Sequence, residues 1–340
     1  MSDTRADLAT DFLAQHGWGA AVRVTIAGDA SNRRYDRLRQ DTGHTAVLMD
    51  APPDKGEDVR PFVRITQELR ERGLSAPAIL AADAAHGFLL LEDLGDDLFA
   101  KVMRDDPSLE TSLYQAAIDA LVHLHEGPAP DLLPYDAEVM TPLAALAFDW
   151  YLPGATGAQD PSAKAAFEAA CHAALFPLDD AADVLIQRDY HAENLLWLPD
   201  RDGVARVGLL DYQDAMRGHR AYDVVSILQD ARRDVAPAMA QSMMDRYVTK
   251  TRKDADAFFT ACALLGMQRN MRILGVFARL SLAYGKPHYV DLIPRVWGHL
   301  MTTLKHPALA ALAPHITDHL PEPTPLVCAT LKDKCGSMPL

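Results

Sequence analysis

The segment over residues 184–197 reads VLIQRDYHAENLLW and places Asp189 and Asn194 five positions apart between two apolar runs. A further apolar run, 207–210, ends at Asp211, and the connection before it contains Asp-Gly, a strong signal for a β-hairpin. With the turn centred on Asp-Gly, Asn194 lies opposite Asp211, where antiparallel partners have Cα atoms about 4.5–5.5 Å apart. Their side chains are therefore predicted to converge beside Asp189.

Oxygen-bearing side chains in this arrangement are typical of magnesium-dependent phosphoryl transfer. Mg²⁺ is a hard cation that in such sites binds one or two carboxylates, substrate phosphates and water. Pro199 and Gly208 weaken the regular ladder, so a register slip of one residue, which would turn one side chain away, stays open. The alternative interpretation is a turn Asp, a capping Asn and a strand-end Asp that only accept backbone hydrogen bonds.

Protein kinases use the same order of elements, Asp-x-x-x-x-Asn followed by a short hairpin that ends in Asp. In those enzymes the base follows His-Arg and the metal-binding Asp begins Asp-Phe-Gly. Here the corresponding strings are Gln187-Arg188-Asp189 and Asp211-Tyr212-Gln213. The three elements stand in the kinase order behind a β-rich region, which favours the catalytic interpretation over the structural one.

The first 93 residues are predicted to form a small β-rich lobe, and residues 94–319 a larger, mainly helical one. In the first lobe, strands are expected over 22–26, 35–38 and 45–49 and on both sides of 83–87, with helices between Ser2 and Gly17 and over 59–72. In the second lobe, helices are expected over 108–126, 141–151, 162–174, 221–231, 236–250 and 254–284. Residues 320–340, rich in Pro and small side chains, are expected to be an irregular tail.

The overall charge argues against partners that carry many negative charges. Among 340 residues, 47 are acidic and 33 basic, a formal net charge of −14, so neither nucleic acid nor an anionic membrane is an expected partner. No apolar run approaches the ~20 residues of a membrane span, and the N-terminus lacks the pattern of a secretory signal, so a cytoplasmic location is expected. The four cysteines are too scattered to predict a zinc site or a disulfide framework.

Several segments together resemble the aminoglycoside phosphotransferase superfamily. The resemblance is greatest to its bacterial branch of anomeric kinases, which phosphorylate N-acetylmuramate and N-acetylglucosamine at the C1 hydroxyl. The segments that carry it are GDASNRRY (28–35), MDAPP (49–53), GFLLLEDLG (87–95), QRDYHAEN (187–194), LDYQDA (210–215), YDVVS (222–226), QRN (268–270) and FARL (277–280). The resemblance implies a protein-kinase-like, two-lobed α+β fold and an ATP- and Mg²⁺-dependent kinase with an alcohol acceptor in peptidoglycan sugar recycling.

The resemblance also implies a role for individual residues. Asp189 would be the catalytic base, and Asn194 and Asp211 would hold Mg²⁺. Glu92 to Leu94 would form the hinge that reads the adenine edge through its backbone.

The loop 28–35 would cover the nucleotide phosphates, with Ser31 facing them. The strand over 45–50 lacks the lysine by which protein kinases hold the phosphates, so Arg33 or Arg34 is the candidate replacement.

An acidic sugar such as N-acetylmuramate would need a cation at the acceptor site. Arg272 and Arg279 are seven positions apart on a predicted helix and so point within about 20° of each other, with Arg269 about 60° further round. This stripe is either a substrate site or a solvated helix face. His191 lies inside the catalytic segment and is a second candidate for sugar contact.

Other functions stay open. The acceptor could be an aminoglycoside, choline or another hydroxyl metabolite, because residues at the site and not the fold determine specificity. A nucleotide-binding pseudokinase is a further alternative, suggested by the missing strand lysine. The sequence gives no indication of the oligomeric state.

Overall fold

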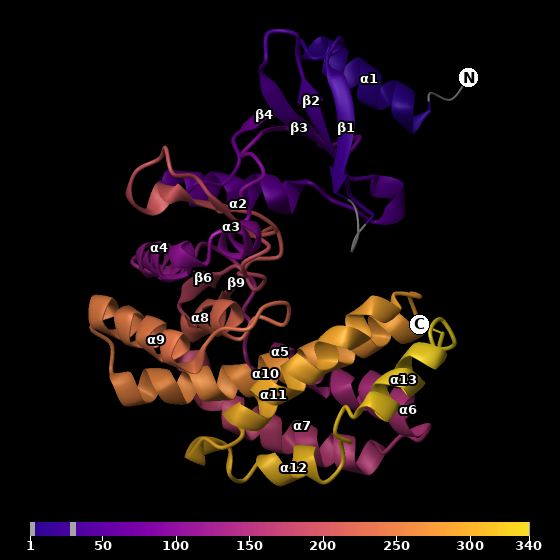
Figure 1. The fold of residues 1–340 in the computed structure, drawn as a ribbon, viewed down its shortest axis with the longest axis vertical. Coiled ribbons are helices and arrows are strands. Elements are labelled where there is room, and N and C mark those ends of the chain that lie inside the picture. Colours follow the sequence, from indigo (N-terminus) through magenta and orange to yellow (C-terminus); the bar gives the residue numbers. More distant parts are fainter. Residues whose placement is uncertain (1–3, 28–31, 340) are drawn as a thin grey trace. The chain divides into compact units, whose positions relative to one another are not determined.

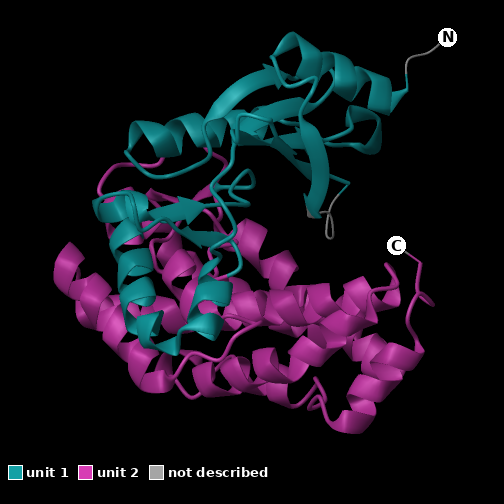
Figure 2. Ribbon diagram, turned by 45° about the horizontal axis from the view of Figure 1, so that its top comes forward, with its two compact units in different colours: residues 1–120, 193–215 teal, residues 121–192, 216–340 magenta. Residues whose placement is uncertain are grey.

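The computed structural model describes residues 4–27 and 32–339. Contacts divide the chain into two compact units, and Figure 2 shows them in different colours. Unit 1 comprises residues 1–120 and 193–215, and unit 2 comprises residues 121–192 and 216–340. None of the helices in the described ranges is both long and apolar enough to cross a lipid bilayer.

Unit 1 is built on a five-stranded antiparallel sheet, as predicted. The strand order is β1-β2-β3-β5-β4. Its strands are β1 (Val22–Ala27), β2 (Arg34–Arg39), β3 (Thr45–Asp50), β4 (Ile79–Asp83) and β5 (Phe88–Glu92). The helices α1 (Arg5–Gln15) and α2 (Arg60–Glu71) correspond to the two expected in this region (Figure 1).

Side chains alternate between the two sides of the strands, so the sheet has two different faces. Leu38, Leu48 and Leu90 lie on one face and are buried against Phe12 and Leu13 of α1. The neighbouring side chains point the other way, because successive residues of a strand face opposite sides of a sheet.

The helix α1 begins at a complete capping box. The Thr4 hydroxyl accepts a hydrogen bond from the backbone N–H of Asp7, and the Asp7 carboxylate accepts one from the Thr4 backbone N–H at 3.0 Å. These bonds satisfy two backbone donors that the first turn would otherwise leave unpaired. The cap is therefore Thr4, whereas Ser2, from which the helix was expected to begin, lies outside the described residues.

A hairpin from the middle of the chain belongs to unit 1. It consists of β7 (Leu195–Trp197) and β8 (Val207–Leu209). The backbone N–H of Leu209 donates to the Ser75 carbonyl at 2.9 Å, and the Ser75 hydroxyl donates to the Ala205 carbonyl at 2.6 Å. The hairpin with Asn194 and Asp211 at its base is thus anchored to the segment that follows α2.

Unit 2 is organised around α10 (Ala255–Leu282), a 28-residue helix with 18 buried residues. It packs against α5 (Ala137–Leu146), α8 (Ala221–Leu228) and α11 (Ile293–Thr303). At Gly275 the helices approach so closely that an added Cβ would lie 2.3 Å from the carbonyl carbon of Leu146, which explains why a glycine stands there. Unit 2 also contains α7 (Pro161–Leu175), α9 (Pro237–Thr251), β6 (Val184–Ile186) and β9 (Met216–Gly218). The helix α4 (Glu110–Leu124) begins in unit 1 and ends in unit 2, with α3 (Phe99–Asp105) before it.

The prediction of an irregular tail over 320–340 is wrong. Residues Pro325–Asp333 form the helix α13, which begins after Thr324, whose hydroxyl accepts from the Val327 N–H. The segment that follows returns to α10, where the Met338 N–H donates to the Leu282 carbonyl at 3.0 Å. A capping threonine followed by a proline in the first turn is typical of a helix start, and an argument from composition alone overlooks this local pattern.

Candidate active site

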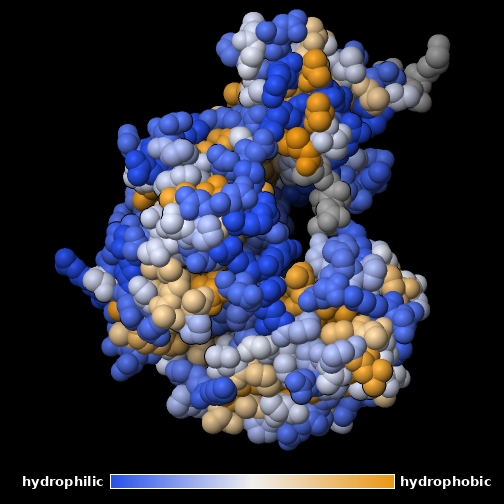
Figure 3. All heavy atoms as spheres, viewed as in Figure 1, coloured by the Kyte–Doolittle hydropathy of each residue, from blue (hydrophilic) through white to orange (hydrophobic). Residues whose placement is uncertain are grey.

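The face of the sheet opposite α1 lines a cavity of about 730 Å³. Val47 on β3 and Leu91 on β5 are paired in the sheet and both face the cavity, as does Ile26 of the edge strand β1. Further apolar walls come from Phe62 of α2 and Leu196 of β7. Figure 3 shows exposed hydrophobic side chains in the region of β1, where Val22, Val24 and Ile26 are exposed. The volume lies within the range of small-molecule sites, and every lining residue belongs to unit 1.

Arg33 supplies a fixed cation in this cavity. Its Nε donates to Glu57 Oε2 at 2.7 Å, and both side chains are largely buried. Burial lowers the pKa of Arg33, but the hydrogen bond and charge of Glu57 together with Tyr35 and Asp214 outweigh it and raise the pKa. Burial in turn raises the pKa of Tyr35 to about 12, so its hydroxyl stays protonated.

The two arginines considered as replacements for the strand lysine differ in position. Arg33 lines the cavity, whereas Arg34 binds Asp36 with its Nη2 at 2.9 Å and is not among the lining residues. Ser31, the other predicted phosphate contact, lies outside the described residues. Glu57 was not anticipated, because its pairing with Arg33 joins segments 24 residues apart.

The predicted hinge residues Glu92 and Leu94 both line the cavity. The Glu92 carboxylate accepts from Arg201 Nη2 at 2.6 Å and from the Ala78 N–H at 3.0 Å, so this side chain already has two hydrogen-bond partners within unit 1. Arg37, which the sequence did not single out, also lines the cavity and donates to Asp96 Oδ2 at 2.7 Å. A ligand would therefore meet mainly the backbone of the hinge.

The hairpin register differs by one residue from the prediction. Leu195 pairs with Leu209, and the N–H of Leu210 donates to the Asn194 carbonyl at 3.0 Å, so Asn194 is opposite Leu210 and not Asp211. The reason is the connection, which contains a 3₁₀ turn over Gly203–Arg206 in place of a two-residue turn.

Asn194 and Asp211 nevertheless meet. Asp211 lies beyond the last residue of β8 and has a left-handed backbone with φ 56°, which turns its side chain back toward the hairpin. Asn194 Nδ2 lies 3.4 Å from Asp211 Oδ2, and Gln213 Nε2 donates to the other carboxylate oxygen at 2.8 Å. Gln213 was missed as a site residue, although it stands two positions after Asp211 in the LDYQDA segment.

The backbone beyond Asp211 is anchored by Tyr212. Its hydroxyl shares a hydrogen bond of 2.7 Å with the Thr66 hydroxyl, and its ring stacks on Phe62 with the centroids 5.0 Å apart. The carboxylate of Asp211 and the amide oxygen of Asn194 are hard oxygen donors inside the cavity, a donor set that fits Mg²⁺.

Asp189 belongs to unit 2, where its loop is held by a buried carboxylate. The preceding residue, Arg188, has a left-handed backbone with φ 72°. The N–H groups of Gln187 and Arg188 donate to the two oxygens of Asp223 at 2.6 and 2.9 Å. Asp223 is fully buried, and this burial raises its pKa to about 7, although both hydrogen bonds favour the ionised form. It therefore fixes the backbone of this loop.

A partly buried arginine lies in the electrostatic surroundings of Asp189. Arg272 Nη1 donates to the Tyr222 hydroxyl at 3.2 Å, and Tyr222 shares a hydrogen bond of 3.3 Å with Tyr135. Burial lowers the pKa of Arg272, but the influence of Tyr222, Tyr135 and Asp189 is stronger and raises it. The result is a permanent cation whose hydrogen-bonded neighbour is a neutral phenol.

The other predicted acceptor residues differ in their surroundings. His191 is buried, and burial lowers its pKa to about 4 despite the opposing charges of Asp230 and Asp189, so it is neutral. Arg269 is only 4% exposed and its Nη1 donates to the Gln229 carbonyl at 3.5 Å, so the solvated-face interpretation is wrong for it. Arg279 is partly buried on the same helix.

Residues 23–258 match the phosphotransferase enzyme family. The chain belongs to this family. A protein of Caulobacter vibrioides named N-acetylmuramate/N-acetylglucosamine kinase is 38% identical over 95% of this chain and 99% of its own length. The protein of the same name from Pseudomonas aeruginosa is 33% identical over 88% of this chain and 90% of its own length.

Solved structures of low sequence identity share the fold. Choline kinase LicA from Streptococcus pneumoniae has a TM-score of 0.59 at 11% identity, covering 87% of this chain and 99% of its own. The aminoglycoside phosphotransferase APH(2")-IIa, solved with gentamicin, also has a TM-score of 0.59, at 12% identity over 91% of this chain and 99% of its own. The predicted α+β, protein-kinase-like fold is confirmed, and the protein is a phosphotransferase.

Asp223→Asn is predicted to lower kcat by at least roughly tenfold with little change in the KM for nucleotide. The amide would point an N–H₂ donor at a backbone donor, and one unpaired buried donor costs about 1–3 kcal/mol. Protonation has the same effect, so the kcat of the unsubstituted enzyme should fall as the pH drops below about 7. The measurement is kcat against pH for both proteins.

The contribution of Asp223 to the free energy of unfolding should change with pH in the direction opposite to kcat. Because burial raises the pKa of Asp223 above its ordinary value of 3.8, folding favours its protonated form. The resulting contribution to the free energy of unfolding is present below about pH 4 and is lost as the pH rises through about 7. An acid limb of kcat that persists unchanged in the Asn variant would contradict the assignment.

Proposed function

We propose that the protein transfers the γ-phosphate of ATP to the anomeric C1 hydroxyl of N-acetylmuramate and of N-acetylglucosamine. The observation that carries the proposal is the 38% identity, over almost the full length of both chains, to a relative named for these two sugars. The site geometry supports the chemistry. The product would be a sugar 1-phosphate, which suits the recycling of peptidoglycan sugars in the cytoplasm, where ATP is available.

The cavity of unit 1 is the proposed nucleotide site. Its apolar walls, Val47 and Leu91 among them, suit the adenine ring, and the backbone between Glu92 and Leu94 offers hydrogen-bonding groups to its edge. Arg33 would face the phosphates, held in place by Glu57. Ser31 stays the predicted second phosphate contact.

Asn194 and Asp211 are the proposed ligands of Mg²⁺. When bound, the ion would neutralise the charge that develops on the phosphate oxygens during transfer. The chain's own contribution is to hold the two side chains together before the nucleotide arrives. Gln213 does this for Asp211 through the hydrogen bond of 2.8 Å.

Asp189 is the proposed base. The C1 oxygen of the sugar would form a bond to the γ-phosphorus while the bond from that phosphorus to the bridging oxygen of ADP breaks. The proton of the hydroxyl would pass to the Asp189 carboxylate. Asp223 positions Asp189 for this task by fixing the backbone of Gln187 and Arg188.

Arg272 is the proposed partner of the carboxylate that N-acetylmuramate carries and N-acetylglucosamine lacks. A partly buried guanidinium whose neighbour is a neutral phenol favours an anionic ligand, because charge-assisted hydrogen bonds are about twice as strong as neutral ones. His191 and Arg269, which lie in the same electrostatic surroundings, would shape the sugar site. Arg279 stays a predicted contact.

The function is tested by incubating the purified protein with Mg·ATP and each sugar in turn and following phosphorus NMR. Both sugars should give an acid-labile C1 phosphate, and Asp189→Asn should lower kcat by at least about 10²-fold, the low end of general-base effects. Choline and an aminoglycoside serve as comparison acceptors. Turnover of either in place of both sugars, or nucleotide binding without any transfer, would overturn the proposal.

Arg272→Gln is predicted to lower the activity toward the two sugars by different amounts. Its kcat/KM for N-acetylmuramate should fall by at least about tenfold more than its kcat/KM for N-acetylglucosamine, since only the first loses a charge-assisted bond of about 1.5–3 kcal/mol. N-acetylglucosamine is the matched control because it lacks the carboxylate. An equal loss for both sugars would assign Arg272 a structural role.

A further inference from the structure

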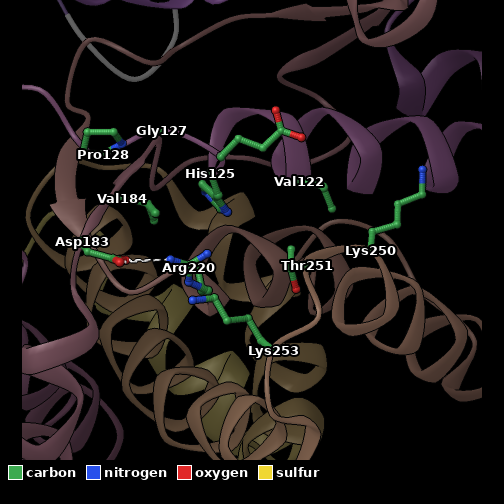
Figure 4. Close-up of a pocket in the computed structure, with 11 residues that line it drawn as sticks. Val122, His125, Gly127, Pro128, Asp183, Val184, Arg220, Lys250, Thr251 and Lys253 are labelled. Atoms are coloured by element: carbon green, nitrogen blue, oxygen red, sulfur yellow. Dashed lines mark hydrogen bonds and ion pairs between the residues drawn. The ribbon is translucent and has the colours of Figure 1, made fainter.

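A second cavity, of about 460 Å³, lies entirely within unit 2. Four segments line it: the end of α4 and the turn after it, the start of β6, the residue before α8, and the end of α9 with the turn after it (Figure 4). None of its lining residues was among the predicted site residues. Its volume is within the range of small-molecule sites.

Positive charge gathers in this cavity although the whole chain carries a formal charge of −14. The cations are Arg220, Lys250 and Lys253, and the carboxylates are Asp183 and Glu126. One carboxylate is already matched, since Arg220 Nη2 lies 2.9 and 3.1 Å from the two oxygens of Asp183. Figure 4 shows this pair and the side chain of Lys253 extending toward Arg220.

The pKa of His219, the residue before Arg220, responds to the same charged groups. Burial and then the charge of Arg220 lower the pKa of His219 to about 4, and Lys253 acts in the same direction. Asp183 opposes them and is outweighed. Because the lining cations outnumber the lining carboxylates by one, the cavity favours an anion.

The wall of the cavity also contains a buried polar group. His125 is only 5% exposed, and its Nδ1 shares a hydrogen bond of 2.8 Å with the hydroxyl of the fully buried Tyr247. Thr251 adds a hydroxyl to the lining. These groups suit a polar, hydroxylated ligand better than an apolar one.

The cavity is connected through the backbone to the loop of Asp189. Asp183 directly precedes β6, which ends three residues before Asp189. Arg220 directly precedes α8, whose Asp223 accepts the two hydrogen bonds from that loop. The Arg220–Asp183 ion pair thus joins the near ends of both elements that hold the proposed base.

We propose that this cavity binds a sugar phosphate monoester, with the phosphate between Lys253 and Arg220, and that its binding lowers kcat. The phosphate competes with Asp183 for Arg220, which loosens the starts of β6 and α8. The loop of Asp189 is then held less firmly. This binding site is separate from the nucleotide cavity, which lies in unit 1.

Binding is tested by calorimetry on the full-length protein, with Mg·ADP present at saturation so that the nucleotide cavity is filled. The probes are glucose 6-phosphate, inorganic phosphate and, as the unphosphorylated control, glucose. Lys253→Gln should weaken the binding of glucose 6-phosphate by at least about tenfold, the loss of one charge-assisted hydrogen bond. Lys305→Gln, the same change at an exposed lysine outside the cavity, should bind like the unsubstituted protein.

The kinetic arm measures kcat with and without glucose 6-phosphate and with the reaction's own sugar 1-phosphate product. The unsubstituted enzyme and Lys305→Gln should both show inhibition that does not compete with the acceptor sugar. In Lys253→Gln the inhibitor should be at least about tenfold less potent, while kcat without inhibitor stays unchanged. Whichever ester inhibits more strongly identifies the source of the ligand.

Three results would overturn the proposal. The first is no binding of the ester at millimolar concentration. The second is equal binding by Lys253→Gln and Lys305→Gln. The third is binding of inorganic phosphate alone. Because calorimetry does not depend on the acceptor, a failure here is distinguishable from a failure of the proposed kinase reaction.

Discussion

Two non-glycine residues with left-handed backbones direct the carboxylates of the proposed site. Arg188 directly precedes Asp189, and Asp211 is itself the second such residue. Left-handed backbone is unfavourable for side chains of this kind and persists only where the surroundings compensate for it. Asp223 compensates at the first position by accepting two backbone hydrogen bonds, and Gln213 and Asn194 hold the side chain at the second. The strain therefore lies where the proposed reaction needs carboxylates in fixed directions.

The rest of the fold supplies rigid supports for these two positions. In unit 1, the sheet buries one face against α1 and leaves the other to line the proposed nucleotide cavity, so one alternating pattern of residues provides both core and cavity wall. In unit 2, α10 carries Arg272 and packs closely on α5 at Gly275. Local backbone strain and buried charge both lower the free energy of unfolding, and the packing of the surrounding core offsets this loss.

Most of the elements could be predicted from the sequence, because apolar periodicity and turn residues are local signals. The strand ladder of unit 1 and the long helix α10 follow from such patterns. The predicted hairpin register was wrong by one residue, because an Asp-Gly pair in the sequence does not indicate that the connection contains a 3₁₀ turn. The helical period placed three arginines on one stripe, but the burial of Arg269 depends on segments far away in the chain. Gln213 and Glu57 act through partners that no local pattern indicates.

The backbone at Asp211 directs a carboxylate toward Asn194, and we propose that this pair forms the metal-dependent part of the nucleotide site. The most direct measurement is the affinity for ADP with and without Mg²⁺, by calorimetry, in the unsubstituted protein and in Asp211→Asn. Asp214→Asn is the matched control, because it removes the same charge from the same cavity. Mg²⁺ should tighten ADP binding at least about tenfold in the unsubstituted protein and in the control, and should have little effect in Asp211→Asn. An undiminished effect of Mg²⁺ in Asp211→Asn would contradict the account.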